Sequence, residues 1–534
     1  MDLLQSILND WDSHNFLQHG LKDWESLAHD AVVLKVTALI ISTVVFAYLF
    51  YGKKHNKDNK SAPKAPWVFW SWVIPFLPMV QMGMDHRKYF KEWQQKYGKA
   101  YRFRLGPHMM PTTCIHDNSF SAMTGRYPDI YKMYDAVKDS GLTIFLRRTD
   151  KMTGKAVMEE LGTILHSKVV SLWQDQNYLE VYCTRLVNEF SRFLSNDAFF
   201  TCSDNCEWKT AHVNDMMHRM MFIATTRGIL GNYDQRLESD EMYSMWWNFD
   251  SMVPLLAIAG QFEFLFRSTR KGQDEFARYL RSLPVEDQTD FFKALTAGLP
   301  MTTSTDLLFL FNHVSHANTG PAIFWIMFRL LRDKKEREEV LAELHDILGE
   351  EQGWSPSSSD APEINYSVVK KLKQLKSYIK DVLRLYSGAW LLRRVMEDQT
   401  VTLENGEQIF LPKGENIVCV NPHFDEAMFP EPHRAKTSRF LPNARIKDAQ
   451  GKDVKLPTMT FGHGTHKCPG ENGAYVVLAT TVAFMFSRYE LELINPSTEV
   501  EPQPDYTRVA FGTMPLDMTF HDHESLQFRF RSKY

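Results

Sequence analysis

Residues Phe461 to Gly470 read FGHGTHKCPG, the most distinctive stretch of this 534-residue chain. Glycines at positions 462, 464 and 470 allow tight turns and a close approach of the backbone around Cys468. The helix-like stretch Glu471 to Arg488 follows directly, so the sulfur is expected at the positive end of a helix dipole, which favours a thiolate. A thiolate held in one geometry is a strong ligand for a metal ion. The stretch therefore predicts that Cys468 is a positioned thiolate able to bind a metal.

The same stretch resembles the haem-binding signature of the cytochrome P-450 family, F-x-x-G-x-[HR]-x-C-x-G. The positions that match are Phe461, Gly464, His466, Cys468 and Gly470. The resemblance implies the cytochrome P-450 fold, which is mainly α with small β-sheets. It implies haem b as the cofactor, with the Cys468 thiolate as the axial ligand of the iron. It also implies that Phe461 packs beside the porphyrin and that His466 reaches a haem propionate.

A second resemblance lies upstream, in the helical stretch Val368 to Ser387, where Asp381 and Arg384 are one helical turn apart. The family has E-x-x-R here, and a further arginine that matches Arg439 completes a buried ion triad behind the haem. Asp381 is one methylene shorter than the family's glutamate, so a backbone shift or a bridging water is expected to complete the contact. The alternative interpretation is a solvated i,i+3 pair.

An arginine just downstream is the candidate partner of a haem propionate. Arg393 stands where the family places that arginine, and the adjacent Arg394 is an alternative.

The stretch Ser304 to Asp333 has apolar residues at helical spacing and fits the helix that crosses the distal face of the haem in the family. Aligning Trp325 with the family's tryptophan puts Ala317 and Asn318 where most members carry an acid and a threonine. That acid–alcohol pair normally helps deliver protons to oxygen, and it is absent here.

Pro321 predicts a kink in this helix, because proline has no N–H to bond the Ala317 carbonyl and clashes with it. Our hypothesis is that Asn318 and a water held at the kink replace the missing pair. The alternative is a kink that serves packing alone.

The segment from His316 to Trp325, HANTGPAIFW, resembles the subgroup that contains cholesterol 7α-, oxysterol 7α- and sterol 12α-hydroxylases and prostacyclin synthase. The resemblance implies either monooxygenation, which we favour, or isomerisation of a peroxide without a reductase. A non-catalytic haem-binding protein and a structural membrane protein with a chance loop are the alternatives from other classes.

The expected substrate is lipophilic, a sterol or terpenoid first, with polyketide or fatty-acid derivatives as alternatives. The resemblance also implies six residues of the substrate pocket wall, although each of them could equally be an ordinary residue of the hydrophobic core. These residues are Val314, Ser315, Ala317, Phe511, Thr513 and Met514.

Residues Ala31 to Tyr51 form a nearly uncharged apolar run long enough to cross a bilayer once, although a buried core helix is the alternative. Five lysines follow between Lys53 and Lys64 and one precedes the run, so the large domain is expected on the cytosolic side. The expected organisation is a lumenal segment 1–30, an anchor 31–51, a basic, Pro-rich hinge 52–78 and a catalytic domain 79–534. A single-pass protein of the endoplasmic reticulum membrane follows.

The composition is ordinary for a globular protein, with 44% hydrophobic and 24% charged residues and a net charge of −4. There is no basic block of the kind that binds nucleic acid, so no nucleic-acid partner is expected. Six cysteines are too sparse for a disulfide framework. The expected protein partner is NADPH-cytochrome P-450 reductase, which would dock on a basic face on the cysteine side of the haem.

Overall fold

The computed structural model describes most of the chain from residue 62 onward, and helices predominate in it. The described residues are 62–68, 77–105, 110–132, 169–202, 207–259, 263–388, 390–420, 423–448, 450–454, 457–464, 467–494, 504–505, 517–518 and 527–534. Within these ranges the strands form only small sheets. The expected class, mainly α with small β-sheets, is confirmed.

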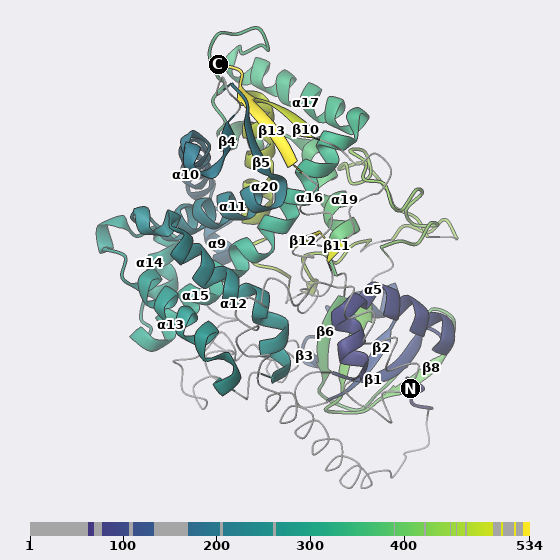
Figure 1. Ribbon diagram of the computed structural model, residues 1–534. Coiled ribbons are helices and arrows are strands. Elements are labelled where there is room, and N and C mark those ends of the chain that lie inside the picture. Colours follow the sequence, from purple (N-terminus) through teal and green to yellow (C-terminus); the bar gives the residue numbers. More distant parts are fainter. Residues whose placement is uncertain are drawn as a thin grey trace.

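The helices occupy one side of the molecule in Figure 1, and the largest sheet lies with α5 on the other side. The helices of the described ranges are α5 (Leu77–Tyr97), α6 (Asn118–Thr124), α9 (Val170–Leu172), α10 (Gln176–Ser195), α11 (Val213–Leu230), α12 (Asp240–Ala259), α13 (Arg267–Arg281), α14 (Asp290–Thr296), α15 (Met301–Ala317), α16 (Thr319–Arg332), α17 (Lys334–Gln352), α18 (Tyr366–Val369), α19 (Lys373–Tyr386) and α20 (Glu471–Arg488). The bounds of α20 confirm the helix expected after the cysteine loop.

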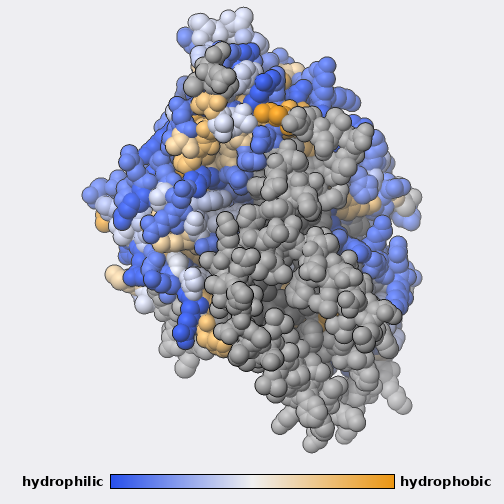
Figure 2. All heavy atoms as spheres, in the orientation of Figure 1, coloured by the Kyte–Doolittle hydropathy of each residue, from blue (hydrophilic) through white to orange (hydrophobic). Residues whose placement is uncertain are grey.

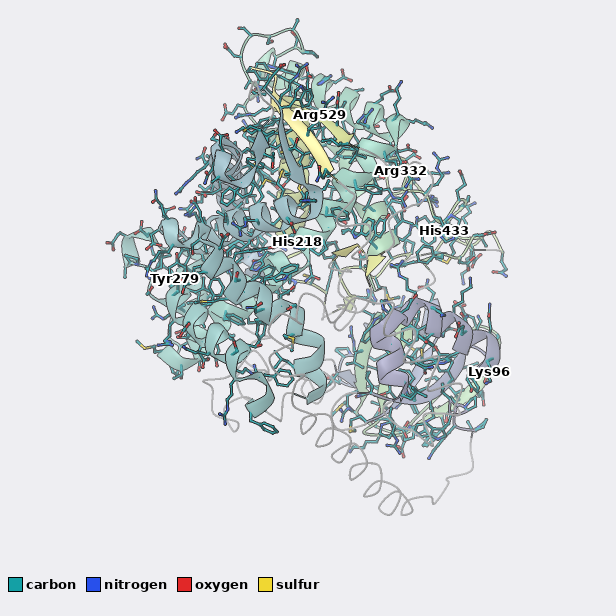
Figure 3. All side chains as sticks on the ribbon, viewed as in Figure 1. Lys96, His218, Tyr279, Arg332, His433 and Arg529 are labelled. Atoms are coloured by element: carbon teal, nitrogen blue, oxygen red, sulfur yellow. The ribbon has the colours of Figure 1, made fainter. Side chains whose placement is uncertain are left out.

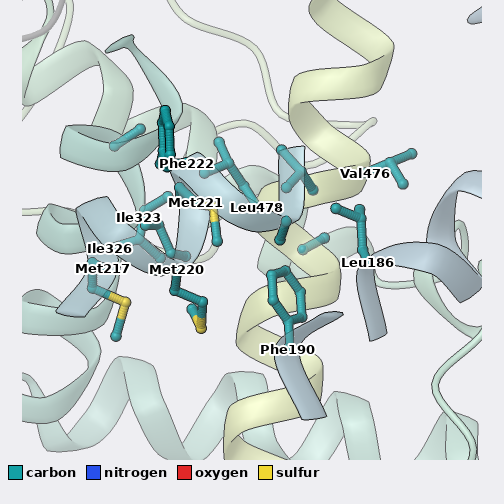
Figure 4. Close-up of a cluster of buried hydrophobic side chains, with 14 of the residues drawn as sticks. Leu186, Phe190, Met217, Met220, Met221, Phe222, Ile323, Ile326, Val476 and Leu478 are labelled. Carbon is teal, nitrogen blue, oxygen red and sulfur yellow. The ribbon is translucent and has the colours of Figure 1, made fainter. Parts of the chain in front are cut away.

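The two central helices are α16 and α20, which are buried along almost their whole length. In α16, every residue from Thr319 to Leu331 is buried. In α20, every residue from Tyr475 to Ser487 is buried, and only the two ends of the helix include partly exposed residues. A helix that is apolar on all sides belongs in a core. Figure 4 shows α10, α11, α16 and α20 meeting through side chains such as Phe190, Met220 and Leu478. The exterior of the face in Figure 2 is largely hydrophilic where it is described.

The sheets brace this helical core from its edges. The five-stranded sheet has the order β1 (Ala100–Leu105), β2 (Met110–Ile115), β9 (Asn416–Val420), β6 (Trp390–Val395) and β3 (Tyr131–Lys132). The four-stranded sheet has the order β10 (Tyr489–Ile494), β13 (Gln527–Ser532), β5 (Lys209–His212) and β4 (Thr201–Cys202). The remaining pairs are β7 (Gln399–Thr402) with β8 (Gln408–Leu411) and β11 (Pro504–Asp505) with β12 (Asp517–Met518). Strand β10 follows α20 directly, so the second sheet is tied to the core helix.

The predicted anchor, residues 31–51, lies outside the described residues. Among those that are described, no helix combines the length and the apolar character needed to span a membrane. Part of the expected hinge, residues 62–68, is packed on the first sheet: the Val68 N–H donates to the Arg102 carbonyl at 2.8 Å, and the Arg102 guanidinium lies 4.4 Å from the Trp67 ring. These residues therefore belong to the folded domain, because strand β1 satisfies their backbone groups.

The expected distal helix is divided into two, and the division lies at Asn318 rather than at Pro321. Helix α15 ends at Ala317, and α16 begins at Thr319. Pro321 is therefore in the first turn of α16, where a backbone N–H has no intrahelical partner and proline is tolerated. The Ala322 N–H still donates to the Asn318 carbonyl at 3.1 Å. The helix is interrupted in the turn before the proline because Pro321 has no N–H to donate to the Ala317 carbonyl.

Helix α16 approaches α11 closely at Gly320. A Cβ at this position would lie 2.7 Å from His218 Nδ1 of α11. Figure 3 labels His218 among the helices, in the interior of the helical part. Glycine is needed here because any side chain would push the two helices apart.

Candidate functional site

Cys468 lies in a tightly hydrogen-bonded loop immediately before α20. Its N–H donates to the Phe461 carbonyl at 2.7 Å, and the Lys467 N–H donates to the Gly464 carbonyl at 3.1 Å. Gly470 is the N-cap residue of α20. Cys468 is therefore two residues before the N-cap of a long buried helix, where a negative charge is favoured.

Two glycines of this loop adopt left-handed backbone conformations. The φ angle is 71° at Gly462 and 67° at Gly464. A Cβ at Gly464 would overlap the carbonyl oxygen of Gly125, which caps the end of α6. Gly464 is thus required by both its conformation and the packing of the loop on α6.

The Cys468 side chain is exposed, yet surrounding protein atoms raise the pKa of its thiol because they disfavour the charged form. A backbone hydrogen bond from Gly470 acts in the opposite direction and favours the thiolate. The Cys468 sulfur is therefore surrounded by protein on most sides and accessible on one side. A metal cation on that side would deprotonate the thiol outright. The sulfur therefore fits the role of an axial iron ligand.

Arg393 supplies a second test of the fit to haem. It is only 2% exposed, and its Nε has no hydrogen-bond partner among the described residues. Its Nη1 donates to the Leu392 carbonyl at 2.8 Å. Desolvation lowers the pKa of the guanidinium, and within the described part of the chain no carboxylate forms an ion pair with it. A buried cation of this kind fits the carboxylate of a haem propionate.

Arg394, the alternative, is placed differently. It is half-buried, and its Nε donates to Asn416 Oδ1 at 2.7 Å across strands β6 and β9. Side chains alternate between the two faces of a strand. Arg393 and Arg394 therefore point to opposite faces, and Arg393 is the better candidate for the propionate.

Asp381, Arg384 and Arg439 lie in direct contact. Arg384 Nε donates to Asp381 Oδ1 at 2.6 Å, and Arg439 Nε donates to Asp381 Oδ2 at 2.8 Å. The Asp381 and Arg384 side chains are fully buried. Arg384 also donates to the carbonyls of His423 and Pro432, at 2.6 and 2.8 Å.

Of the two compensations expected at the shorter aspartate, a backbone shift or a bridging water, the described contacts do not require the bridging water. Both arginines reach the carboxylate directly, and the Lys436 N–H donates to Asp381 Oδ2 at 2.8 Å as well. The segment from 423 to 439 folds around α19, which brings the Lys436 N–H and the Arg439 guanidinium within hydrogen-bonding distance of Asp381. The alternative of a solvated pair is excluded by the burial of both side chains.

Helix α15 has one face that is partly exposed. Val314 is 43% exposed, although most residues from Thr303 to Ala317 are buried, and Ser315 and Asn318 are half-buried. Asn318 is four positions after Val314 and three after Ser315, so it shares a face with both. Ala317 is buried. An apolar helix with one open face is what a bound porphyrin and substrate require.

Some predicted site residues fall outside the described residues. These are His466, Phe511, Thr513 and Met514. Phe461 is described, and its ring centroid lies 5.4 Å from that of Tyr475 in α20.

A basic surface beside the cysteine loop was not located from the sequence. We call it the α19 lysine surface, and it consists of Lys373, Lys376, Lys380 and Lys467. The first two and the last are exposed, and Lys380 is half-buried. Desolvation is the largest cause that lowers the pKa of Lys380. The negative charge of Glu471 opposes this shift, and the positive charges of Lys467 and Lys376 lower the pKa further. The i,i+3,i+7 spacing along α19 was the signal that could have revealed this surface.

The comparisons with known proteins agree with the geometry. The family model described as Cytochrome P450 matches residues 285–520. The 5-beta-cholestane-3-alpha,7-alpha-diol 12-alpha-hydroxylase of Sus scrofa is 25% identical over 58% of this chain and 64% of its own length. The Cholesterol 7-alpha-monooxygenase of Cricetulus griseus is 28% identical over 58% of this chain and 64% of its own length. Cytochrome P450 7B1 of Mus musculus is 26% identical over 86% of this chain and 90% of its own length. The aligned part thus spans less than two thirds of the first two relatives.

Proposed function

Because the chain belongs to the cytochrome P450 family of haem-thiolate monooxygenases and is related to sterol hydroxylases, we propose that it inserts one oxygen atom from O2 into a lipophilic substrate. Electrons come from NADPH through a reductase. In each turnover one oxygen atom enters a C–H bond, the other leaves as water, and two electrons and two protons are consumed. The observation that carries this proposal is the Cys468 loop at the start of α20, together with the uncompensated Arg393 cation.

The cofactor we propose is haem b. When bound, it supplies the oxygen activation, with the Cys468 thiolate as its axial ligand. Arg393 and His466 hold its propionates, and Phe461 packs beside the ring. Asp381, Arg384 and Arg439 support the loop from behind and take no part in the chemistry.

The open face of α15 faces the reacting groups in this proposal. The Asn318 side chain takes the place of the missing acid–alcohol pair by holding a water molecule. The Ala317 carbonyl receives no N–H from Pro321, so it is free to accept a second hydrogen bond from the same water. The support is the interruption of the helix at Asn318 and the half-exposure of its side chain.

The proposed substrate is a sterol, with terpenoids and other lipophilic metabolites as alternatives. The names of the relatives support a sterol, and the apolar open face of α15 at Val314 supports a lipophilic molecule. Ser315, Phe511, Thr513 and Met514 complete the proposed pocket wall. We also propose that residues 31–51 anchor the enzyme in the endoplasmic reticulum membrane, with the catalytic domain in the cytosol.

The reductase docks on the α19 lysine surface. Lys467 is adjacent to Cys468, so a partner bound there is close to the sulfur side of the haem. Complementary charges steer such encounters, so the matching surface of the reductase is expected to be acidic.

The test uses membranes that contain the wild-type protein or Cys468→Ala, with reductase, a sterol mixture and labelled oxygen gas. We expect one labelled atom in a product that forms only with NADPH and only in the wild type. Unlabelled, Cys468-dependent conversion of a lipid peroxide without NADPH would instead establish an isomerase, which the absence of the acid–alcohol pair also permits.

A further inference from the structure

A band of polar side chains winds around α15 from its buried side to its open face. At 100° per residue, the order around the axis of α15 is His316, Asn312 and Ser315, and the C-cap residue Asn318 lies beyond Ser315. His316 and Asn312 are buried, whereas Ser315 and Asn318 are half-buried on the open face. The open face carries no acidic side chain, because its members are Phe311, Val314, Ser315 and Asn318.

We propose that the Ser315 hydroxyl is a positioning residue that, with the Asn318 amide, orients the water from which protons reach the open face of α15. The inference rests on the monooxygenase function proposed above and adds a second group to the water site at Asn318. It gives Ser315, a member of the proposed pocket wall, a second role toward this water through its hydroxyl.

Thr319, the threonine next to Asn318 in the sequence, is not available for this role. Its Oγ1 donates to the Ser315 carbonyl at 2.6 Å, and the residue is only 7% exposed. Both Thr319 and Ser315 donate to a backbone carbonyl, but the Thr319 side chain is buried, so its oxygen cannot accept from water on the open face. A hydroxyl that serves the open face must come from another position.

Ser315 meets the geometric requirement because it is three residues before Asn318 on the same face. Its Oγ donates to the Asn312 carbonyl at 2.7 Å. A hydroxyl has one donor and two acceptor lone pairs, so this bond leaves the oxygen able to accept only. Water beside it must therefore donate one hydrogen to Ser315 Oγ, and its other hydrogen is turned toward Asn318 and the substrate side.

The turn that carries Ser315 is fixed from behind. Asn312 Nδ2 donates to Thr226 Oγ1 of α11 at 2.7 Å, and Thr226 Oγ1 donates to the Phe222 carbonyl at 2.6 Å. All three residues are buried. The Ser315 oxygen is therefore pre-oriented by the packing of α15 on α11 and needs no rearrangement during turnover.

The test compares Ser315→Ala, Ser315→Thr and Ser304→Ala with the wild type. Ser304 is the matched control because its Oγ donates to the Met301 carbonyl at 3.0 Å, the same i→i−3 bond, but the residue is buried. The measurements are product formed per NADPH consumed, hydrogen peroxide released, the solvent deuterium isotope effect and the spectral dissociation constant of the substrate.

We expect Ser315→Ala to lower the product formed per NADPH by about tenfold, because an oriented proton donor contributes at least a tenfold rate effect. The electrons that are not used for product appear as hydrogen peroxide, and the solvent deuterium isotope effect becomes larger. Substrate affinity stays within about twofold, Ser315→Thr restores coupling, and Ser304→Ala behaves as wild type. Unchanged coupling in Ser315→Ala, or a loss that follows weaker substrate binding, would overturn the inference while leaving the monooxygenase intact. A wild type without NADPH-dependent product would contradict the proposed function itself.

Discussion

Asp381 shows how much one buried side chain can determine in this protein. Its two oxygens accept from Arg384 and Arg439 and from the Lys436 N–H. Removing one member of a buried ion network leaves the other charges without compensation, which costs far more than the network contributes as a whole. The shorter side chain is sufficient here because its partners come within direct hydrogen-bonding distance.

We predict that Asp381→Ala lowers the free energy of unfolding by about 3–5 kcal/mol, because two buried guanidinium groups lose their carboxylate. Asp381→Glu restores the family residue but adds a methylene to a filled site, so it costs roughly 1–3 kcal/mol. Urea unfolding of the purified proteins measures both changes. A glutamate variant more stable than the wild type would show that the aspartate contacts are suboptimal.

His316 makes the folded state sensitive to acid. The residue is fully buried, and its ring centroid is 4.1 Å from that of Trp246 and 5.2 Å from that of Phe222. Desolvation, followed by the charges of His313 and His218, lowers its pKa well below 6.5, although a contact with the Asn312 backbone partly opposes this. The neighbouring Asp250 of α12 lies 3.5 Å from His313. Neither ring nitrogen of His316 has a hydrogen bond within the described part of the chain.

The sign of the resulting pH dependence follows from the lowered pKa. Above the unfolded value of about 6.5 the imidazole is neutral in both states, and below it only the unfolded state binds the proton. Stability is therefore complete above pH 6.5 and falls as the pH decreases, by roughly 1.4 kcal/mol per pH unit for this histidine. We predict that His316→Phe reduces the slope of unfolding free energy against pH between 6.5 and 5 by this amount. Equal slopes for variant and wild type would assign the acid sensitivity to other buried histidines.

At the scale of helices, α19 owes its position to a carboxylate from α17. Leu372, the N-cap residue of α19, provides no side-chain hydrogen bond, and Glu343 accepts instead from the Gln374 and Leu375 N–H groups at 2.7 and 3.0 Å. Helix starts need such an acceptor for their unbonded N–H groups. Glu343 therefore holds the helix that carries Asp381 and Arg384.

We predict that Glu343→Ala destabilises the protein by about 1–2 kcal/mol, the usual cost of losing an N-terminal cap. The shift in the thermal midpoint of unfolding measures this loss. Glu338→Ala is the matched control, because Glu338 is an exposed residue of α17 that makes only an i,i+4 contact with Lys334 at 3.7 Å. A variant at Glu343 that unfolds like this control would mean that water caps α19 equally well.

The helices also show where sequence reasoning succeeds. The bounds of α20 follow from local signals, namely Gly470 before it and continuous apolar residues within it. The division at Asn318 was predicted three residues late, because the sequence shows the proline but not which turn adjusts to it. The Arg384 and Arg439 contacts of Asp381 were predicted through the family resemblance. The Glu343 cap and the Lys436 N–H bond to Asp381 depend on segments tens of residues apart, so no local pattern reveals them.

At the scale of the whole molecule, the α19 lysine surface and the helix α15 lie on different elements with different tasks. Lys376 Nζ is 5.0 Å from the Tyr475 ring of α20, and Lys380 Nζ is 4.8 Å from the Phe440 ring. The lysines therefore cover the outside of the core that holds the cysteine loop. In the proposed function, electrons enter at this surface, and substrate and oxygen use the open face of α15.

Reversing charge on this surface separates electron entry from the remaining chemistry. We predict that Lys376→Glu raises the KM for reductase by about tenfold at low salt and that the difference narrows as salt screens the charges. Turnover driven by added peroxide needs no reductase, so it stays unchanged, as does the absorption spectrum of the reduced carbon monoxide complex. Lys271→Glu is the control, since Lys271 is an exposed lysine of α13, a helix that packs on α12 and α15. If Lys376→Glu lowers peroxide-driven turnover as strongly as NADPH-driven turnover, its effect is on the cysteine loop and the reductase docks elsewhere.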